Sequence, residues 1–289
     1  MTQVRHLHTG ALFLVMSNGL TATVDAAAKY MSPSLHGVQV VWGYSLAIAV
    51  LVLGYAAIRP KPFRHVFATA RPLLQLGRGA MLFVTISMLF VALAYMPLAD
   101  VIAISFAGPL FITVLAVPLL SERVGLHRVA AVVVGLVGVA IVMRPGAGVF
   151  EWAALLALAS ALFFALFQIA TRVLAATERP FTTLLYTAIG ALACSSLAVP
   201  FFWAPISAFE AGVFAVIGVL GVGAHVCMIR AYEFTQASFL APFNYAKLLW
   251  AVALGYLIFG DVPQTNVVAG SVVIVASGLY VLYRERARR

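Results

Sequence analysis

The sequence predicts an all-α membrane protein with ten transmembrane helices. Apolar residues make up 64% of the chain and charged residues 9%, and the mean hydropathy is +1.06, whereas a soluble domain carries about 25% charged residues. The chain divides into ten apolar segments, most of them close to the ~20 residues that cross a ~30 Å hydrocarbon layer. The connections between them are short, so almost nothing is left over to build a soluble domain.

The ten segments define the expected elements in chain order. The first contains several polar residues, among them Asn18 and Asp25, which a cleavable signal would not tolerate, so we interpret it as the first span. The expected spans are 9–30, 36–58, 72–95, 98–119, 126–143, 150–174, 182–203, 209–231, 237–259 and 265–283.

The basic residues are distributed as in a membrane protein with both ends in the cytoplasm. Of the eighteen Lys and Arg residues, fourteen fall in one alternating set of loops and tails. Only Lys29 and Arg144 belong to the other set, and Arg78 and Lys247 lie within spans. Positive loops stay in the cytoplasm, and an even number of spans also requires both termini on one side. The formal charge of +9 is therefore a topology signal rather than a nucleic-acid footprint, and we expect a multi-pass protein of the bacterial inner membrane.

The chain also contains an internal repeat. The dipeptide Ala94-Tyr95 recurs as Ala231-Tyr232, 137 residues later, each time before an apolar span and a glycine-containing span. Each half has five spans, an odd number, so the two halves enter the membrane in opposite orientations. Such inverted repeats are typical of secondary transporters, whose sites lie at the repeat interface. The expected units are residues 1–145 and 146–289.

Several motifs resemble the EamA-type module of the drug/metabolite transporter superfamily. They are Arg78-Gly79, Ala94-Tyr95, Ala99, Pro109, Ser121-Glu122-Arg123, Gly135, Gly138 and Arg144-Pro145, with a weaker copy in the second half. Within the superfamily the chain is most similar to bacterial amino-acid and metabolite exporters, including YddG-like proteins. The resemblance implies a central cavity lined by the first four helices of each module, and alternating access without ATP hydrolysis. One departure is Gly43-Tyr44, where many members place an Arg.

Three charged residues, Lys247, Arg78 and Asp25, are candidate functional residues within the spans, because a charge at the bilayer centre costs ~3 kcal/mol or more. Lys247 lies ten residues into its span, close to the midplane, and we expect it to face the transport path and hold a substrate carboxylate or a partner anion. Arg78 is either a substrate contact or an anchor at the inner interface. Asp25 and Lys29 have i,i+4 spacing, which favours a local ion pair. The alternative is that Asp25 is a protonatable gate or coupling residue.

The other candidates are uncharged or aromatic. Polar side chains within spans usually form interhelical hydrogen bonds, and deep aromatic residues are usually core or lipid-facing, so a cavity role is the minority interpretation for each. Two prolines interrupt the fourth and ninth spans and are candidate gating positions. The candidates for substrate binding are Asn18, Asn244, Gln168, His225, Tyr245 and Phe106, and those for gating are Pro109 and Pro242.

The leading hypothesis is a secondary transporter that exports small organic solutes, amino acids above all, with aromatic ones included. A multidrug exporter of the same fold is the alternative, and an intramembrane enzyme is a weaker one. No GxxxxGK[ST], HExxH or comparable catalytic motif occurs in the sequence, so we expect neither enzyme activity nor a cofactor or metal. The expected partners are a small-molecule substrate, the lipid bilayer and a proton or exchanged solute. No motif specifies the oligomeric state.

Overall fold

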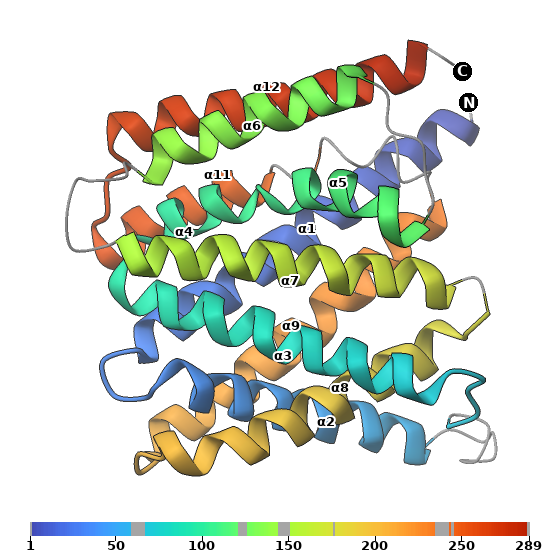
Figure 1. Ribbon diagram of the computed structural model, residues 1–289. Coiled ribbons are helices and arrows are strands. Elements are labelled where there is room, and N and C mark those ends of the chain that lie inside the picture. The colour runs from blue at the N-terminus through green and yellow to red at the C-terminus, as the bar shows by residue number, and fades with distance from the viewer. Residues whose placement is uncertain are drawn as a thin grey trace.

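The computed structural model describes residues 2–58, 67–120, 126–143, 151–175, 177–234, 243 and 246–287. Within these ranges helices are the only regular secondary structure (Figure 1). Six helices are long and apolar enough to cross a membrane, and four shorter apolar helical stretches lie in the other four predicted spans. The prediction of an all-α membrane protein is therefore confirmed, and each of the ten predicted spans contains an apolar helix, six of them long enough to cross a membrane.

The helices follow the predicted spans closely, with the fourth, seventh and ninth spans each divided into two elements. In chain order they are α1 (Thr2–Met31), α2 (Gly37–Ile58), α3 (Pro72–Tyr95), α4 (Leu98–Ser105), α5 (Gly108–Leu120), α6 (Leu126–Met143), α7 (Glu151–Ala175), α8 (Pro180–Ala198), η2 (Val199–Phe202), α9 (Ala208–Phe234), α11 (Ala246–Leu254), η4 (Gly255–Phe259) and α12 (Thr265–Ala287).

The predicted fourth span is broken into α4 and α5. The amide of Phe106 donates to the carbonyl of Ala103 at 3.2 Å, and that of Ala107 donates to Ile104 at 2.9 Å, so the chain makes tight turns between the two helices. Pro109 lacks an N–H and favours the first turn of a new helix, which explains why α5 starts at Gly108. The break follows the most deeply buried helix, since the side chains of α4 are almost fully enclosed.

The ninth span ends in a π-helical turn, η4. It stops at Gly260, whose φ of 70° lies in the left-handed region that glycine adopts without strain. The amide of Asp261 then donates back to the carbonyl of Gly255 at 3.1 Å. Single π-helical turns are local irregularities that often occur at functional sites. Here the π-helical turn is followed directly by Gly260 and the acidic residue Asp261.

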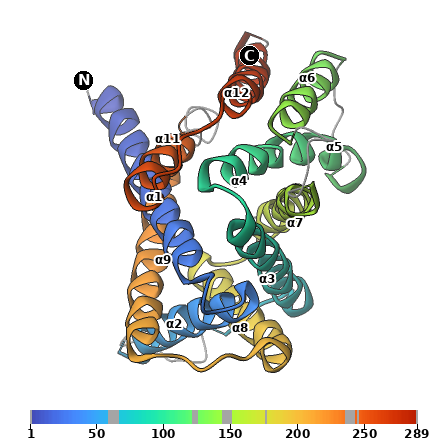
Figure 2. The same cartoon turned by 90° about the vertical axis from the view of Figure 1, so that its left-hand side faces the viewer.

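The helices form a bundle in which helices distant in sequence pack together. α1 packs against α9, and α3 packs against α7 (Figure 2). α2 contacts both α8 and α9, and α3 also contacts α8. α6 and α12 pack against each other at one edge of the molecule, and the chain begins and ends at the same end of the bundle (Figures 1 and 2).

Glycines allow two of these helix pairs to approach closely. A Cβ atom on Gly138 of α6 would lie 3.0 Å from the carbonyl oxygen of Gly270 in α12, and one on Gly79 of α3 would lie 2.8 Å from the Cα atom of Gly190 in α8. Small residues are the usual means by which membrane helices approach each other. Gly79 and Gly138 therefore allow close packing of α3 with α8 and of α6 with α12.

Candidate functional site

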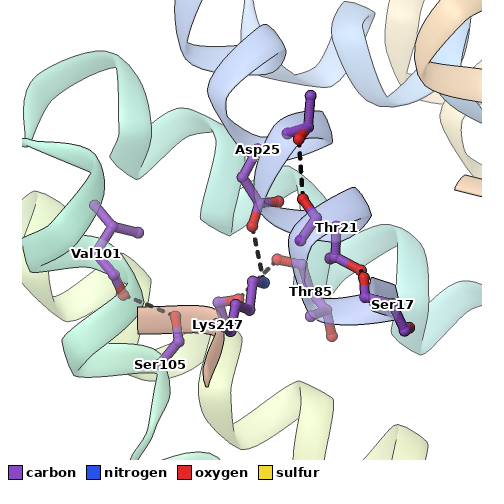
Figure 3. A network of polar contacts seen from close by, with 10 residues as sticks. Ser17, Thr21, Asp25, Thr85, Val101, Ser105 and Lys247 are labelled. Carbon is purple, nitrogen blue, oxygen red and sulfur yellow. Dashed lines mark hydrogen bonds and ion pairs between the residues drawn. The ribbon is translucent and has the colours of Figure 1, made fainter. Parts of the chain in front are cut away.

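An ion pair between the first and ninth spans lies inside the bundle. The ammonium nitrogen of Lys247 in α11 is 2.8 Å from Oδ2 of Asp25 in α1 (Figure 3). Asp25 is 3% exposed, and it lies six residues, or about 9 Å of helix axis, before the end of α1. Oδ2 accepts no hydrogen bond with suitable angles from the described residues, so charge attraction dominates the contact. The expected partner anion of Lys247 is thus a residue of the protein itself.

The predicted local pair between Asp25 and Lys29 is wrong. Lys29 instead donates to Oδ2 of Asp261 at 2.7 Å, and its ammonium lies 4.8 Å from the ring centroid of Phe259. An i,i+4 pair on a helix surface contributes only about 0.3–0.5 kcal/mol. The packing of α11 and η4 against α1 gives each charge a partner from a distant part of the chain, which an analysis of helical spacing alone could not find.

Hydrogen bonds also join α1 to its neighbours about two helical turns before Asp25 in the sequence. Asn18 Nδ2 donates to the carbonyl of Phe243 at 2.9 Å, and Ser17 Oγ donates to the carbonyl of Ala224 in α9 at 2.8 Å. Asn18 therefore makes the interhelical bond that is the default for a polar residue in a span. Figure 3 also draws Thr85 of α3 and Ser105 of α4, whose hydroxyls donate at 2.8 Å to carbonyls of their own helices, those of Met81 and Val101.

A second buried charge, Arg78, lies between α3, α7 and α8. It is 8% exposed. Its Nε donates to Thr171 Oγ1 at 2.7 Å and its Nη1 donates to Thr187 Oγ1, while its guanidinium carbon lies 4.1 Å from the ring centroid of Phe167. Among the described residues no carboxylate forms an ion pair with Arg78. Within the part of the chain that the structure describes, its charge is therefore met by neutral oxygens and an aromatic face.

Polar contacts also join the helix ends that lie away from the termini. Ser34 donates to Oε1 of Glu210 at the start of α9. The side-chain amide of Gln39, which is fully buried, donates to the carbonyl of Ala204 at 2.7 Å and accepts from its amide at 2.9 Å. Together with Lys29 and Asp261, these contacts connect the ends of α1, α2, α9 and η4.

The remaining predicted site residues are dispersed or lie outside the described residues. Phe106 is buried at the break between α4 and α5, and Gln168 and His225 are half-buried on α7 and α9. Pro242, Asn244 and Tyr245, and the side chain of Pro109, are outside the described residues. The charged candidates therefore form two polar sites, one at Asp25 and Lys247 and one at Arg78.

Sequence reasoning missed the partners that define these sites. Thr171, Thr187 and Phe167 surround Arg78, and Asp261 neutralises Lys29. Threonine is common in spans, and only its position relative to an arginine on another helix makes it informative. Within the described residues, no group of three His, Cys, Asp or Glu side chains could hold a metal ion.

Comparison with known proteins identifies the family. The model of the EamA-like transporter family matches residues 8–144 and again residues 151–283. The chain belongs to this family. It is therefore a transporter of the drug/metabolite transporter superfamily, a multi-pass membrane protein and not an enzyme, and it handles a small-molecule substrate.

Curated relatives with different cargoes match almost the whole chain. A riboflavin transporter of Vibrio cholerae is 30% identical over 99% of this chain and 96% of its own. An S-adenosylmethionine uptake transporter of Rickettsia prowazekii is 26% identical over 96% and 93%, and the pseudopaline exporter CntI of Pseudomonas aeruginosa is 27% identical over 94% and 95%. A solved crystal structure shares the fold, with a TM-score of 0.66 at 18% identity over 98% of this chain and 99% of its own.

Proposed function

We propose that this EamA-family protein exports small organic solutes, namely amino acids, including aromatic ones, and related metabolites, across the bacterial inner membrane. Both termini would lie in the cytoplasm, as the alternation of basic loops predicts. S-adenosylmethionine, the cargo named for one relative, is itself an amino-acid derivative, which supports this substrate class. The relatives are named for uptake as well as for export, so the direction rests on the family resemblance of the sequence.

The ion pair between Asp25 and Lys247 is the observation that carries this proposal. It joins the first span of one predicted five-helix unit to the fourth span of the other. A buried pair contributes little net stability compared with apolar packing, because desolvation offsets the attraction. Such a pair inside a bundle is better explained by a conformational or coupling role than by stability, and intramembrane charges mark transport and proton pathways.

The helix contacts support a two-unit mechanism. α1 packs against α9 as α7 packs against α3, and α3 contacts α8 as α2 contacts α9. In the two predicted units, α1, α2 and α3 correspond to α7, α8 and α9. Each of these contacts therefore has a counterpart in which the two units have exchanged places. In a rocking mechanism the units move about their shared interface, and ties between units must form and break in each cycle. The Lys29–Asp261 and Ser34–Glu210 contacts would close the outer end in this conformation.

Asp25 would couple transport to a proton. Protonation of its carboxyl would remove the counter-ion of Lys247 and weaken the link between α1 and α11. Exchange of solute without a proton would require no such step. The pH dependence of flux in Asp25→Asn therefore distinguishes the two: a proton-coupled transporter loses the pH dependence in this variant, and an unchanged pH profile would remove Asp25 from the mechanism.

Flux into liposomes tests the transport function directly. Purified protein would be reconstituted into liposomes. Entry of radiolabelled L-phenylalanine, S-adenosylmethionine, riboflavin or the lipophilic cation ethidium into these liposomes would then be measured. We expect saturable flux with counterflow for the two amino-acid compounds. Flux that does not saturate would indicate a channel, and preferential movement of ethidium would favour the multidrug alternative.

A further inference from the structure

The charge of Lys247 is already neutralised within the protein, which changes where a substrate anion would bind. Its ammonium is held 2.8 Å from Asp25, so a substrate carboxylate would have to displace a buried side-chain carboxylate. Arg78, by contrast, is the buried cation that has only neutral partners among the described residues. The sequence placed the anion contact at Lys247, and the structure favours a different residue.

The hydroxyl groups around Arg78 are oriented so that they act as acceptors. Thr171 Oγ1 donates its own hydrogen to the carbonyl of Phe167 at 2.7 Å, and Thr187 Oγ1 donates to the carbonyl of Thr183 at 2.6 Å. Their lone pairs therefore face Arg78 and hold two of its five N–H groups in a fixed direction. The neighbouring Gln75, also buried, donates to Thr183 Oγ1 at 3.1 Å.

Among the described residues these contacts use only two of the donors of Arg78. Two threonine bonds account for two N–H groups, and three more belong to the same planar guanidinium. The ring of Phe167 lies against one face of Arg78, and a cation–π contact of this kind stabilises a buried cation only modestly. Burying a cation without a counter-ion is costly. Neutral hydroxyls and one ring meet only part of that cost, and a bidentate carboxylate would supply the missing counter-charge.

The position of Arg78 suits the loading of a solute from the side of the termini. It is six residues, or about 9 Å, from the start of α3, and α3 begins at the end of the bundle where both chain termini lie (Figure 1). The contacts that join the helix ends lie at the opposite end.

We propose that Arg78, positioned by Thr171, Thr187 and Phe167, binds the carboxylate of the transported solute, and that Lys247 does not. The inference rests on the proposed transport function. The substrate class is a small organic solute with a carboxylate, and the guanidinium would engage it through two parallel N–H bonds. Lysine cannot reproduce that geometry, which makes Arg78→Lys the informative substitution because it keeps the charge.

Competition with matched ligands tests the site. The wild-type protein and Arg78→Lys, Arg78→Gln and Lys247→Gln would be reconstituted, and uptake of labelled L-phenylalanine would be competed with unlabelled L-phenylalanine or its carboxamide. We expect the wild type to prefer the carboxylate, and both Arg78 variants to reduce that preference about tenfold or more. Lys247→Gln should keep the preference, even if its maximal rate falls. The reverse result, with the preference lost in Lys247→Gln and kept in Arg78→Lys, would overturn the proposal.

Further variants and a binding assay show whether an Arg78 variant has lost carboxylate binding alone. They distinguish this result from loss of folding and from loss of transport. Phe167→Leu and Thr187→Val keep the charge of Arg78 and should weaken the carboxylate preference less than Arg78→Lys does. Thermal stabilisation by L-phenylalanine reports binding without transport, and should be lost in the Arg78 variants while the unliganded melting temperature reports folding. If the wild type transports solutes but does not prefer L-phenylalanine to its carboxamide, the proposed carboxylate site at Arg78 is wrong while the transport function stands. Absence of flux for every solute would overturn the transport function, and the site with it.

Discussion

At the scale of single residues, two charges of the first span form ion pairs with residues distant in the sequence. Asp25 and Lys29 lie one helical turn apart, yet each takes its partner from the ninth span or the residues that follow it. In a low-dielectric interior every charge needs a close counter-charge or several hydrogen bonds. Tertiary packing brought direct partners within 2.8 Å, and these contacts prevailed over the weak local attraction.

The Asp25–Lys247 pair predicts a strongly non-additive pattern of stability. Asp25→Asn or Lys247→Gln leaves one buried group without its counter-charge, and each should lower the free energy of unfolding by about 3–5 kcal/mol. The double variant removes both charges and should lose much less than the sum. Denaturation of the four proteins in detergent micelles measures the coupling.

Lys29→Gln serves as the control in this cycle, because the Lys29–Asp261 pair is more exposed, with side chains 16% and 28% accessible. Its loss should cost about 1 kcal/mol or less. Additive effects of the Asp25 and Lys247 substitutions would mean that their contact contributes nothing.

At the scale of helices, close approach depends on particular glycines and not on glycine content. Gly77 and Gly79 lie on the same helix, yet a Cβ on Gly77 would meet nothing within 4 Å, whereas one on Gly79 would meet the backbone of α8. Both positions have the same residue type and helical context. The difference comes entirely from what packs against each face of α3.

This pair of glycines yields a matched test. Gly79→Ala should destabilise the protein by about 1–3 kcal/mol, because α3 and α8 must separate to admit the methyl group. Gly77→Ala should be neutral or should stabilise by up to ~1 kcal/mol, because alanine favours the helix. Melting temperatures in detergent report both values, and equal effects at the two positions would contradict the α3–α8 contact.

The Lys29–Asp261 contact at the helix ends predicts that its loss changes the populations of the transporter's conformations rather than its stability. Asp261→Asn removes the partner of Lys29 and should shift the population towards a state open at that end. Cysteines introduced near the ends of α1 and η4 would then react faster with a membrane-impermeant maleimide. The variant Asp261→Glu, which keeps the charge, should react more slowly than Asp261→Asn, and equal rates would argue against a gate.

At the scale of the whole molecule, the bundle places both chain ends together and packs α6 against α12 at one edge. The proposed topology predicts that both ends face the cytoplasm. Reporter fusions or accessibility labels at the two termini of the full chain should therefore give the same cytoplasmic result. Labels on opposite sides would contradict the even number of spans.

Much of the fold was predictable because the bilayer constrains it. Ten segments of suitable length and an alternating distribution of basic residues led to the helices, since backbone polar groups in lipid must be satisfied within a helix. The division of the fourth span was less predictable. Proline is tolerated in spans, and only the turns at Phe106 and Ala107 show that this one starts a new helix.

The site was predictable only in part. Residue type and depth identified Asp25, Arg78 and Lys247 as unusual, because charges in a span need an explanation. Their roles depend on partners from other helices, and no periodicity in one segment reveals which helix lies opposite. The sequence by itself therefore determined the membrane-spanning architecture and the candidate charges. The tertiary structure alone decided which charges neutralise each other and which one, Arg78, has only neutral partners among the described residues.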